Sequence, residues 1–396
     1  MAVDPNRRPH GRVVRGSGGY TAFVPAPLPP PLTWDGELVA ALSNADRAIG
    51  RLAGEGWRFP NPELFIIPFL RREAVLSSRI EGTRTTLEEL LAAQAGVPVE
   101  RSSEDLEEVA NYVDALEYGL ERLDSLPLSL RLIREMHERL MRGVRGDMAT
   151  PGEFRRSQNW IGPPGCTLND ASYVPPPADE LMGCLDALER FLHEDTLPPL
   201  VHAGLAHAQF EAIHPFLDGN GRIGRLLITL LLVERKILPS PLLYLSAYFE
   251  ASREDYYAHL LAVTQEGAWE RWLAYFLRGV QLQAEDAVER MEEIDGLFEE
   301  WREALAGVQT GRPVEVLRLF VENPFWTVGG IAEELGVAYT TARRAIERLE
   351  TAGIVSQTGT SKRNRVYCAR EMLEVLEAPH AARRHPSRKG TSSGGT

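Results

Sequence analysis

The sequence predicts an all-α fold with one small β-hairpin and a C-terminal winged helix-turn-helix domain. Apolar residues recur at the spacing of a single helix face through most of residues 36–300. Residues 152–177 break this pattern, because two short β-type runs flank a turn rich in Gly, Pro, Asn and Asp. From residue 313 onward, short helical patterns are followed by β-type segments and a basic turn, which is the order of a winged helix.

Composition narrows the classes of protein that need to be considered. The 396 residues are 44% hydrophobic and 25% charged, which is ordinary for a globular chain of two or three domains. The net charge of −13 argues against a protein that coats nucleic acid, so DNA contact would require a local basic patch. Three widely spaced cysteines predict neither a disulfide framework nor a zinc site, and they fit a cytoplasmic protein. We expect no signal peptide and no membrane span.

The N-terminal third combines an irregular segment with helices. Residues 1–34 are rich in Gly, Pro and Arg, and we expect a flexible, poorly ordered arm. Residues 35–125 form an N-terminal helical region, with a first helix over 36–52 and a second that ends near Glu81 with Gly82 as its C-cap. Thr85 and Thr86 each precede a glutamate by three residues, which indicates the start of another helix.

The central region, residues 126–300, reads as a helical core. Helices are expected over 129–141, 181–192, 199–211, 222–238, 253–264 and 269–300, and an earlier one over 105–123. His202 and His207 are five residues apart on one of these helices, so they do not share a face as metal ligands would. We expect both to be packing or hydrogen-bonded core residues.

Residues 212–232 concentrate groups suited to phosphate chemistry. A Gly-Asn-Gly loop opens a helix, whose free N–H groups and dipole attract anions. Arg222 and Arg225 supply donors for phosphate oxygens, and Asp218 supplies a hard ligand for Mg²⁺. His214 is the group there that could move a proton near neutral pH. The residues predict a di- or triphosphate site with a metal and a base, and the alternative is a surface turn before a buried helix.

Residues 214–225 resemble the signature motif of the Fic/DOC family, with the sequence His-Pro-Phe-x-Asp-Gly-Asn-Gly-Arg-x-x-Arg from His214 to Arg225. We call residues 214–225 the signature segment. The resemblance implies a Fic helical core that transfers AMP from ATP to a Ser, Thr or Tyr hydroxyl of a protein. It implies His214 as the catalytic base, Asp218 as the Mg²⁺ ligand, and ATP binding by Gly219, Asn220, Gly221, Arg222, Ile223, Gly224 and Arg225. The Asn220 side chain is expected to help hold the phosphates.

Ser77-x-x-x-Glu81-Gly82 resembles the inhibitory motif that many Fic proteins carry on a helix before the core. The resemblance implies that Glu81 pairs with Arg225 and blocks the productive pose of the γ-phosphate. The alternative is a surface glutamate at a frayed helix end. The trigger that would release Glu81 is not encoded in any pattern that we recognise.

Two further parts of the site follow from the resemblance. The hairpin corresponds to the flap that holds a target segment by main-chain pairing, with Trp160, Ile161, Tyr173 and Val174 as its positions. The alternative is a solvent loop whose Trp160 plugs the core. Residues 246–260 resemble the wall of the adenine pocket, with Tyr257 as the contact and Tyr256 as the second choice. Both tyrosines could instead be packing residues.

The winged helix-turn-helix is expected over residues 310–370, followed by a disordered basic tail over 379–396. The side chains that would contact DNA are Arg343, Arg344, Lys362 and Arg363, although such domains also dock proteins. A DNA-binding regulator with a nucleotide-sensing core is therefore one alternative function. A Fic enzyme with another donor, or one that removes AMP, is another. The resemblance also implies homodimerisation, which no residue pattern tests.

Overall fold

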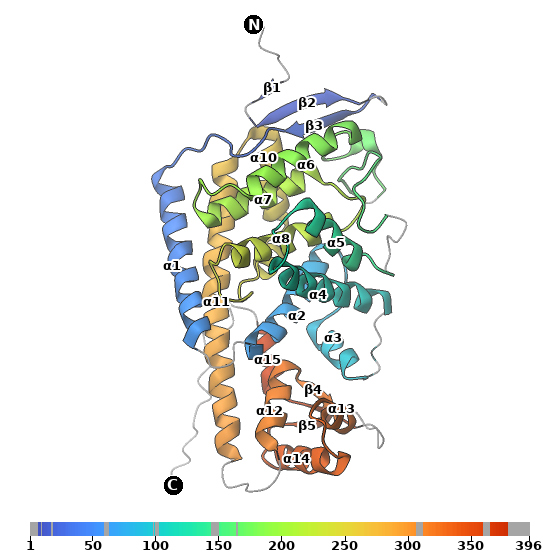
Figure 1. Ribbon diagram of the computed structural model, residues 1–396, viewed down its shortest axis with the longest axis vertical. Coiled ribbons are helices and arrows are strands. Elements are labelled where there is room, and N and C mark those ends of the chain that lie inside the picture. The colour runs from blue at the N-terminus through green and yellow to red at the C-terminus, as the bar shows by residue number, and fades with distance from the viewer. Residues whose placement is uncertain are drawn as a thin grey trace, which may run out of the picture. The chain divides into compact units, whose positions relative to one another are not determined.

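A computed structural model describes residues 7–8, 10–16, 19–58, 63–97, 99, 103–143, 150–163, 165–305, 312–358 and 365–378 (Figure 1). The chain divides into two compact units. The first comprises Met1–Leu90 and Val99–Val288, and the second comprises Leu91–Pro98 and Glu289–Thr396. The fold is mostly helical, with small sheets.

Helices dominate the first unit. They are α1 (Gly36–Arg58), α2 (Glu63–Ile80), α4 (Ser103–Leu123), α5 (Leu130–Leu140), α6 (Ala178–Leu192), α7 (Pro199–Ile213), α8 (Asn220–Glu234), α9 (Ser246–Ala251) and α10 (Arg253–Glu266). Two helices, α3 (Leu87–Gln94) and α11 (Trp269–Ala304), contain the points where the chain passes between the units. The capping box predicted before α3 is present at Thr86, whose hydroxyl accepts from the Glu89 N–H at 3.1 Å and whose N–H donates to the Glu89 carboxylate at 2.8 Å.

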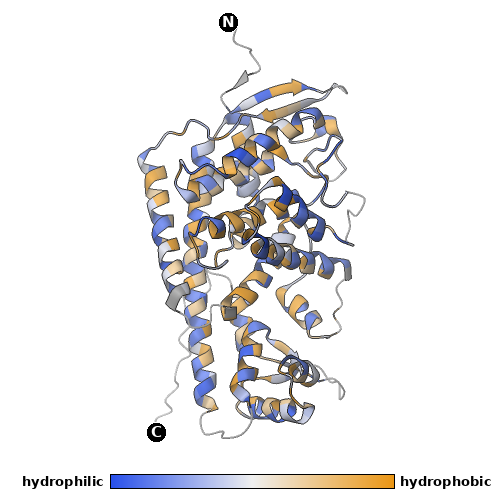
Figure 2. Ribbon diagram, viewed as in Figure 1, coloured by the Kyte–Doolittle hydropathy of each residue, from blue (hydrophilic) through white to orange (hydrophobic). Residues whose placement is uncertain are grey.

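The centre of the first unit is the pair α7 and α8, which pack against each other. Nearly every residue of both helices is buried, which is typical of helices that lie in the middle of a core. Figure 2 shows this as a mostly apolar α8, whereas α1 carries apolar and polar residues along its length. The loop between α7 and α8 contains the start of the signature segment, so its ends are held by the most buried helices of the unit.

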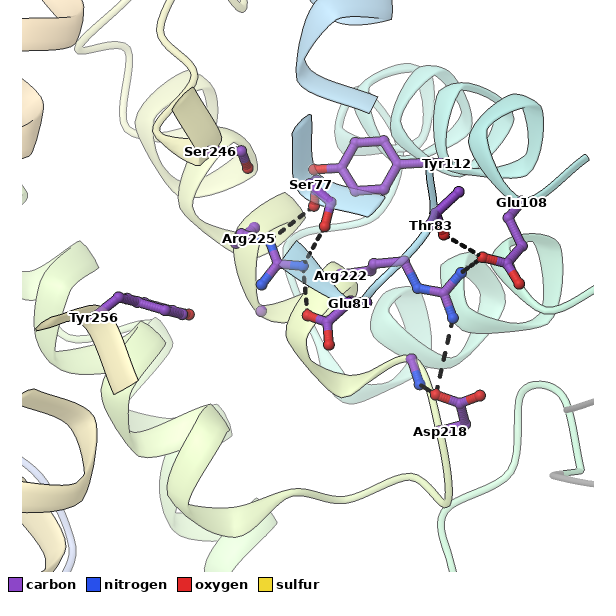
Figure 3. Close-up of polar contacts among 12 residues, drawn as sticks. Ser77, Glu81, Thr83, Glu108, Tyr112, Asp218, Arg222, Arg225, Ser246 and Tyr256 are labelled. Carbon is purple, nitrogen blue, oxygen red and sulfur yellow. Dashed lines mark hydrogen bonds and ion pairs between the residues drawn. The ribbon is translucent and has the colours of Figure 1, made fainter. Parts of the chain in front are cut away.

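The packing of α2 brings the N-terminal region to the start of α8. Helix α2 packs against α4, α8 and α9. Its buried face includes Phe69, Ala74 and Ser77. This packing carries the C-terminal end of α2, and therefore Glu81 just beyond it, to the first turn of α8 (Figure 3).

The expectation of a poorly ordered arm over residues 1–34 is wrong for part of that segment. Strands β1 (Arg7–Arg8), β2 (Gly11–Arg15) and β3 (Thr21–Pro25) form an antiparallel sheet in which Val13 pairs with Phe23. The side chains of residues 22–24 are buried, and the Phe23 N–H donates to the Val174 carbonyl at 2.9 Å. Burial of this short apolar run outweighs the Gly and Pro content on which the expectation rested.

The predicted hairpin over residues 152–177 is reduced to one antiparallel bridge. Ile161 and Tyr173 exchange N–H···O bonds of 2.9 and 3.1 Å, and a 3₁₀ turn (Leu168–Asp170) lies between them. Pro163, two residues after the bridge residue Ile161, has no N–H to extend a ladder. Trp160 is 42% exposed, so the alternative in which it plugs the core is wrong.

The second unit contains a three-stranded antiparallel sheet and short helices. The elements are α12 (Pro313–Glu322), β4 (Phe325–Thr327), α13 (Val328–Glu334), α14 (Tyr339–Thr351), β5 (Ser356–Thr358), β6 (Val366–Cys368) and α15 (Arg370–Glu377). The sheet order is β4-β6-β5. Helix α14 buries Ala342, Ile346 and Leu349 and exposes Arg343 and Arg344. Lys362, Arg363 and the tail over 379–396 lie outside the described residues.

Within the described ranges, no helix combines the length and the apolar content needed to cross a membrane.

Candidate active site

His214 lies at the end of α7 in a conformation that few residues other than glycine adopt. Its φ of 49° and ψ of 63° are left-handed. Its N–H bonds to the Phe210 carbonyl at 2.9 Å, and its own carbonyl accepts from Arg155 Nε at 2.9 Å and from Asn159 Nδ2 at 3.3 Å. These three bonds, one within α7 and two from residues 155–159, hold the histidine in a backbone conformation that would otherwise be unfavourable.

The imidazole of His214 is neutral at physiological pH. Burial lowers its pKa to about 4, and the positive charge of Arg155 acts in the same direction. The Glu211 backbone and the carboxylates of Glu81 and Asp218 oppose this lowering only in part. A neutral imidazole has a nitrogen that can accept a proton, so His214 is in the form that a general base requires.

The loop after His214 is held by the side chain of Asn220. Its Oδ1 accepts from the Phe216 N–H at 2.8 Å, and its Nδ2 donates to the Phe216 carbonyl at 2.9 Å. The Phe216 ring is fully buried and stacks on His137 with 3.7 Å between ring centroids. Both polar atoms of the Asn220 side chain are thus bound to the backbone of Phe216, and a contact of this side chain with phosphates stays a prediction.

We expect Asn220→Ala to lower the free energy of unfolding by about 1–3 kcal/mol, because it removes the acceptor of the buried Phe216 N–H and one of the two donors to the Phe216 carbonyl, which keeps its bond from Asn159 Nδ2 at 2.8 Å. Chemical denaturation followed by circular dichroism measures this change. The matched control is Asn169→Ala, an exposed asparagine of the 3₁₀ turn, which we expect to have almost no effect. Equal stabilities of the two variants would show that the Asn220 bonds do not hold the loop.

The first turn of α8 presents backbone donors to the space in front of it. Gly219 precedes the helix with φ of 76°, a region that favours glycine. The first intrahelical bond of this helix runs from the Ile223 N–H to the Gly219 carbonyl at 3.0 Å. The N–H groups of residues 220–222 therefore have no acceptor within the helix, and together with the helix dipole they form a position for an anion.

Glu81 lies beside this first turn and forms an ion pair with Arg225. The Arg225 guanidinium donates to the Glu81 carboxylate at 2.7 Å, to the Ser77 hydroxyl at 2.8 Å and to the Ser77 carbonyl at 2.9 Å (Figure 3). A Cβ atom on Gly221 would lie 2.2 Å from the Glu81 carboxylate, so the absent side chain of Gly221 is what admits Glu81. The carboxylate thus lies against the first turn of α8, and the predicted contact between Glu81 and Arg225 is present.

The charge of Glu81 is maintained by this contact. Partial burial of the carboxylate would raise its pKa, but the charge and hydrogen bond of Arg225 outweigh that effect and lower the pKa below its usual value. The Glu81 side chain is still 35% exposed, so the contact can be reached and displaced from solvent. Arg225, in contrast, is buried.

The other arginine of the signature segment has different neighbours. The Arg222 guanidinium lies 3.7 Å from the Glu108 carboxylate and 3.9 Å from the Asp218 carboxylate. One oxygen of Asp218 accepts from the Gly219 N–H at 2.6 Å, and the side chain is 53% exposed. Among the described residues, no group of three His, Cys, Asp or Glu side chains could hold a metal by itself. A single exposed carboxylate suits Mg²⁺, which proteins bind through few ligands together with substrate phosphates.

A cavity of about 660 Å³ connects these features. Glu81, His214, Gly221, Arg225 and Tyr257 line it, and so do Trp160, Ile161 and Tyr173 from the segment that contains the isolated bridge. The remaining residues of the predicted ATP site do not line it: Asp218, Gly219, Asn220, Arg222, Ile223 and Gly224. Ile223 instead points into the core, and the Gly224 carbonyl is bound to the His207 ring at 2.8 Å.

The two candidate tyrosines differ in their surroundings. Both line the cavity, but Tyr256 is buried and its hydroxyl is already bonded to His207 Nε2 at 2.8 Å. Tyr257 is exposed on the wall of the cavity. The expectation that His202 and His207 are hydrogen-bonded core residues is confirmed, since His202 bonds to the Phe191 carbonyl at 2.8 Å.

Val174, the fourth predicted flap residue, does not line the cavity. Its carbonyl accepts the Phe23 N–H from β3, so this part of the segment is tied to the N-terminal sheet.

The cavity also contains a carboxyl that we did not expect. One oxygen of Glu211 is buried without a hydrogen-bond partner among the described residues. It lies where a Cβ on Gly224 would be only 2.3 Å away. Burial raises the pKa of Glu211 to about 8; Arg225 opposes this shift and Glu81 adds to it. The one signal in the sequence was its position three residues before His214 on the same helix. Arg155, which holds the His214 carbonyl, had no such signal.

Comparison with known proteins places these features in a family. Residues 39–121 match the family model "Fic/DOC family N-terminal", and residues 127–232 match "Fic/DOC family". "Protein adenylyltransferase Fic" of Drosophila yakuba is 30% identical over 189 residues, which cover 47% of this chain and 34% of that protein. The Drosophila melanogaster protein of the same name is 31% identical over the same extent. The chain thus spans about a third of the length of these curated relatives.

Solved structures share the fold. A Fic family protein from Desulfovibrio desulfuricans G20 is similar with a TM-score of 0.56 and 22% identity, over 86% of this chain and 98% of that one. A Fic-1 fragment from C. elegans is similar with a TM-score of 0.50 and 22% identity, over 65% of this chain and 74% of that one. With the matches to both family models and the geometry of the signature segment, we conclude that the chain belongs to the Fic/DOC family.

Proposed function

We propose that the protein is an adenylyltransferase that transfers AMP from ATP to a Ser, Thr or Tyr hydroxyl of a protein, and that Glu81 inhibits it. The observation that carries the proposal is the 2.7 Å contact between Glu81 and Arg225, which lies against the first turn of α8 and in the same cavity as His214. The names of the Drosophila relatives, which are adenylyltransferases, support the reaction type.

In the proposed reaction, His214 removes the proton from the attacking hydroxyl. The hydroxyl oxygen then forms a bond to the α-phosphorus while the bond from that phosphorus to the bridging oxygen breaks, and pyrophosphate leaves. A positioned base contributes ~10²–10⁴ in rate to such a step. The neutral state of His214 and the hydrogen bonds that hold its backbone support this role.

The other residues would neutralise and orient the triphosphate. The N–H groups at the start of α8 would bind phosphate oxygens, and Arg222 and Arg225 would bind the oxygens farther along the chain of phosphates. Mg²⁺, held at Asp218, would supply positive charge to the same oxygens. Most of the catalysis of such transfers comes from positioning and charge neutralisation, so the geometry of these residues matters more than their number.

Inhibition by Glu81 follows from what Arg225 can bind. Two of the guanidinium nitrogens are engaged by Ser77 and Glu81, and the third, Nη1, is buried without an acceptor among the described residues. The Glu81 carboxylate also places a negative charge at the helix end that would receive a phosphate. A triphosphate would therefore have to displace Glu81 or bind in a pose that does not lead to transfer.

The protein substrate would bind beside the cavity at Trp160, Ile161 and Tyr173. These residues line it, and the backbone there already forms one antiparallel bridge, which supports addition of a further strand. Tyr257 is the proposed contact of the adenine, because its ring lies on the cavity wall. Homodimerisation stays a prediction from the family.

The second unit is secondary in this proposal. The order α12-β4-α13-α14-β5-β6 supports a winged helix. On α14, however, Arg343 is paired with Glu347 at 2.8 Å, which reduces the positive charge available to DNA phosphates. We therefore favour the transferase reaction over DNA-binding regulation as the function of the protein.

The reaction type can be tested with ATP labelled either on the α- or on the γ-phosphate. Glu81→Gly protein, incubated with Mg²⁺ and each nucleotide, is expected to retain the α-label on itself or on added lysate proteins and to release the γ-label as pyrophosphate. The same experiment with labelled GTP, CTP and UTP tests the choice of donor, and ATP is expected to be used best. Retention of the γ-label would identify a phosphotransferase instead, and failure to bind any nucleotide would contradict the proposal.

A further inference from the structure

Arg222 is a buried cation whose hydrogen bonds are not satisfied by the protein. Its side chain is only 5% exposed. Its Nη2 makes a weak hydrogen bond to the Met141 sulfur at 3.6 Å, and its Nε and Nη1 atoms have no hydrogen-bond partner among the described residues. A buried charge of this kind is costly unless carboxylates lie near it. Two carboxylates lie near it, that of Glu108 at 3.7 Å from Nη1 and that of Asp218 at 3.9 Å from Nη2 (Figure 3).

Glu108 is held in place from outside the signature segment. It projects from α4, its side chain is 15% exposed, and its Oε2 accepts a 2.7 Å hydrogen bond from the Thr83 hydroxyl. The same oxygen faces Arg222. Thr83 is itself fixed, because its N–H bonds to the Ser78 carbonyl at the end of α2. The Glu108 carboxylate is therefore a fixed negative charge beside the Arg222 guanidinium.

Asp218 is the less restrained of the two carboxylates. It is half exposed, and its carboxylate accepts a hydrogen bond from the N–H of the next residue, Gly219. In the proposed function Asp218 must remain available to Mg²⁺. An arginine that moved the short distance to a direct contact with Asp218 would compete with the metal for that carboxylate, since both are cations that bind its oxygens.

We propose that Glu108 is a positioning residue that attracts Arg222 away from Asp218 and so keeps Asp218 available to Mg²⁺. This inference rests on the proposed function and adds a residue from α4 to its site. In the arrangement of Figure 3, the guanidinium is shared between the two carboxylates at similar distances. Removing the charge of Glu108 leaves Asp218 as the one carboxylate within 4 Å of the guanidinium among the described residues, and the guanidinium then moves toward it.

The test measures the Mg²⁺ requirement of ATP binding in a protein that cannot turn ATP over. The parent protein is Glu81→Gly/His214→Ala, and ATP affinity is measured by isothermal titration calorimetry at a series of Mg²⁺ concentrations. Glu108→Gln is expected to raise the Mg²⁺ concentration for half-maximal ATP binding about tenfold, as loss of a residue that supports a metal ligand does. Thr83→Val, which leaves Glu108 charged but less fixed, is expected to act in the same direction by a smaller factor.

Two further variants separate positioning from general damage. Glu107→Gln, an exposed neighbour on α4, is the matched control and should leave the Mg²⁺ requirement unchanged. Glu108→Gln/Arg222→Gln should return the Mg²⁺ requirement toward that of the parent, because no cation remains to bind Asp218, even though ATP affinity falls.

Three results would overturn the inference. They are an unchanged Mg²⁺ requirement in Glu108→Gln, an equal loss of ATP affinity at every Mg²⁺ concentration, and a double variant that remains as impaired as Glu108→Gln. If the parent itself binds no ATP, the proposed function has failed, which is a separate outcome.

Discussion

Replacing Glu81 with glycine is expected to raise the rate of AMP transfer by about 10- to 100-fold. The Glu81 carboxylate makes a charge-assisted hydrogen bond with Arg225, and such bonds contribute about 1.5–3 kcal/mol. A triphosphate no longer has to displace this bond in the glycine variant. Each 1.4 kcal/mol corresponds to a factor of about ten in an equilibrium constant, and the one-third exposure of Glu81 favours the lower part of the range. Initial rates of label transfer from α-labelled ATP measure the change.

Two control variants show whether the charge or the size of the Glu81 side chain causes the inhibition. Glu81→Gln keeps the size of the side chain and loses its charge, so it should activate less than glycine. Glu107→Gln removes an exposed glutamate elsewhere and should not activate at all. Equal rates for the wild-type and Glu81→Gly proteins, with ATP bound to both, would mean that the contact with Arg225 is structural and not inhibitory.

The second large effect is expected at His214. In the Glu81→Gly background, His214→Ala should lower the rate of transfer by ~10²–10⁴, the contribution of a positioned general base. ATP affinity should change little, because the residues proposed to bind phosphates are on α8 and are not altered. The single-turnover rate and the ATP dissociation constant, measured on the same protein samples, separate the two quantities. His193→Ala, at an exposed position after α6, is the matched control and should transfer normally.

The pH dependence of the Glu81→Gly protein gives an independent check on His214. Its lowered pKa of about 4 means that the neutral base is present above that pH and is lost only as the pH falls through it. The value of kcat/KM, which reflects groups of the free enzyme, should therefore stay nearly level from pH 7 to pH 5. With an ordinary histidine pKa near 6.5, kcat/KM would instead fall roughly 25-fold over that interval. A fall of that size would show that the burial of His214 does not persist in the active protein.

Much of this site could be predicted from local patterns. The loop from His214 to Gly221 and the start of α8 depend on residues close together in the sequence, and both are where the pattern indicated. The capping box at Thr86 is equally local. The pairing of Glu81 with Arg225 joins residues 144 positions apart and could be expected only because the family resemblance supplied it.

The parts that could not be predicted depend on tertiary contacts. No sequence pattern distinguishes Glu108 from Glu104 or Glu107. Its proposed positioning role follows from the packing of α4 beside Arg222. The Asn220 side chain could equally have faced a ligand, and only the folded loop shows that Phe216 uses both of its polar atoms. The N-terminal sheet was missed because its composition resembles that of an irregular arm, whereas its stability comes from burial against Val174 and its neighbours.

The central claim is that the active site has all the residues that the proposed transfer needs and that Glu81 inhibits it. Intact-mass spectrometry of the wild-type, Glu81→Gly and Glu81→Gly/His214→Ala proteins after incubation with Mg²⁺ and ATP tests it most directly. We predict that Glu81→Gly gains the mass of AMP, that the wild-type protein gains far less, and that the double variant gains none. Equal adducts on the wild-type and Glu81→Gly proteins, or an undiminished adduct on the double variant, would contradict the claim.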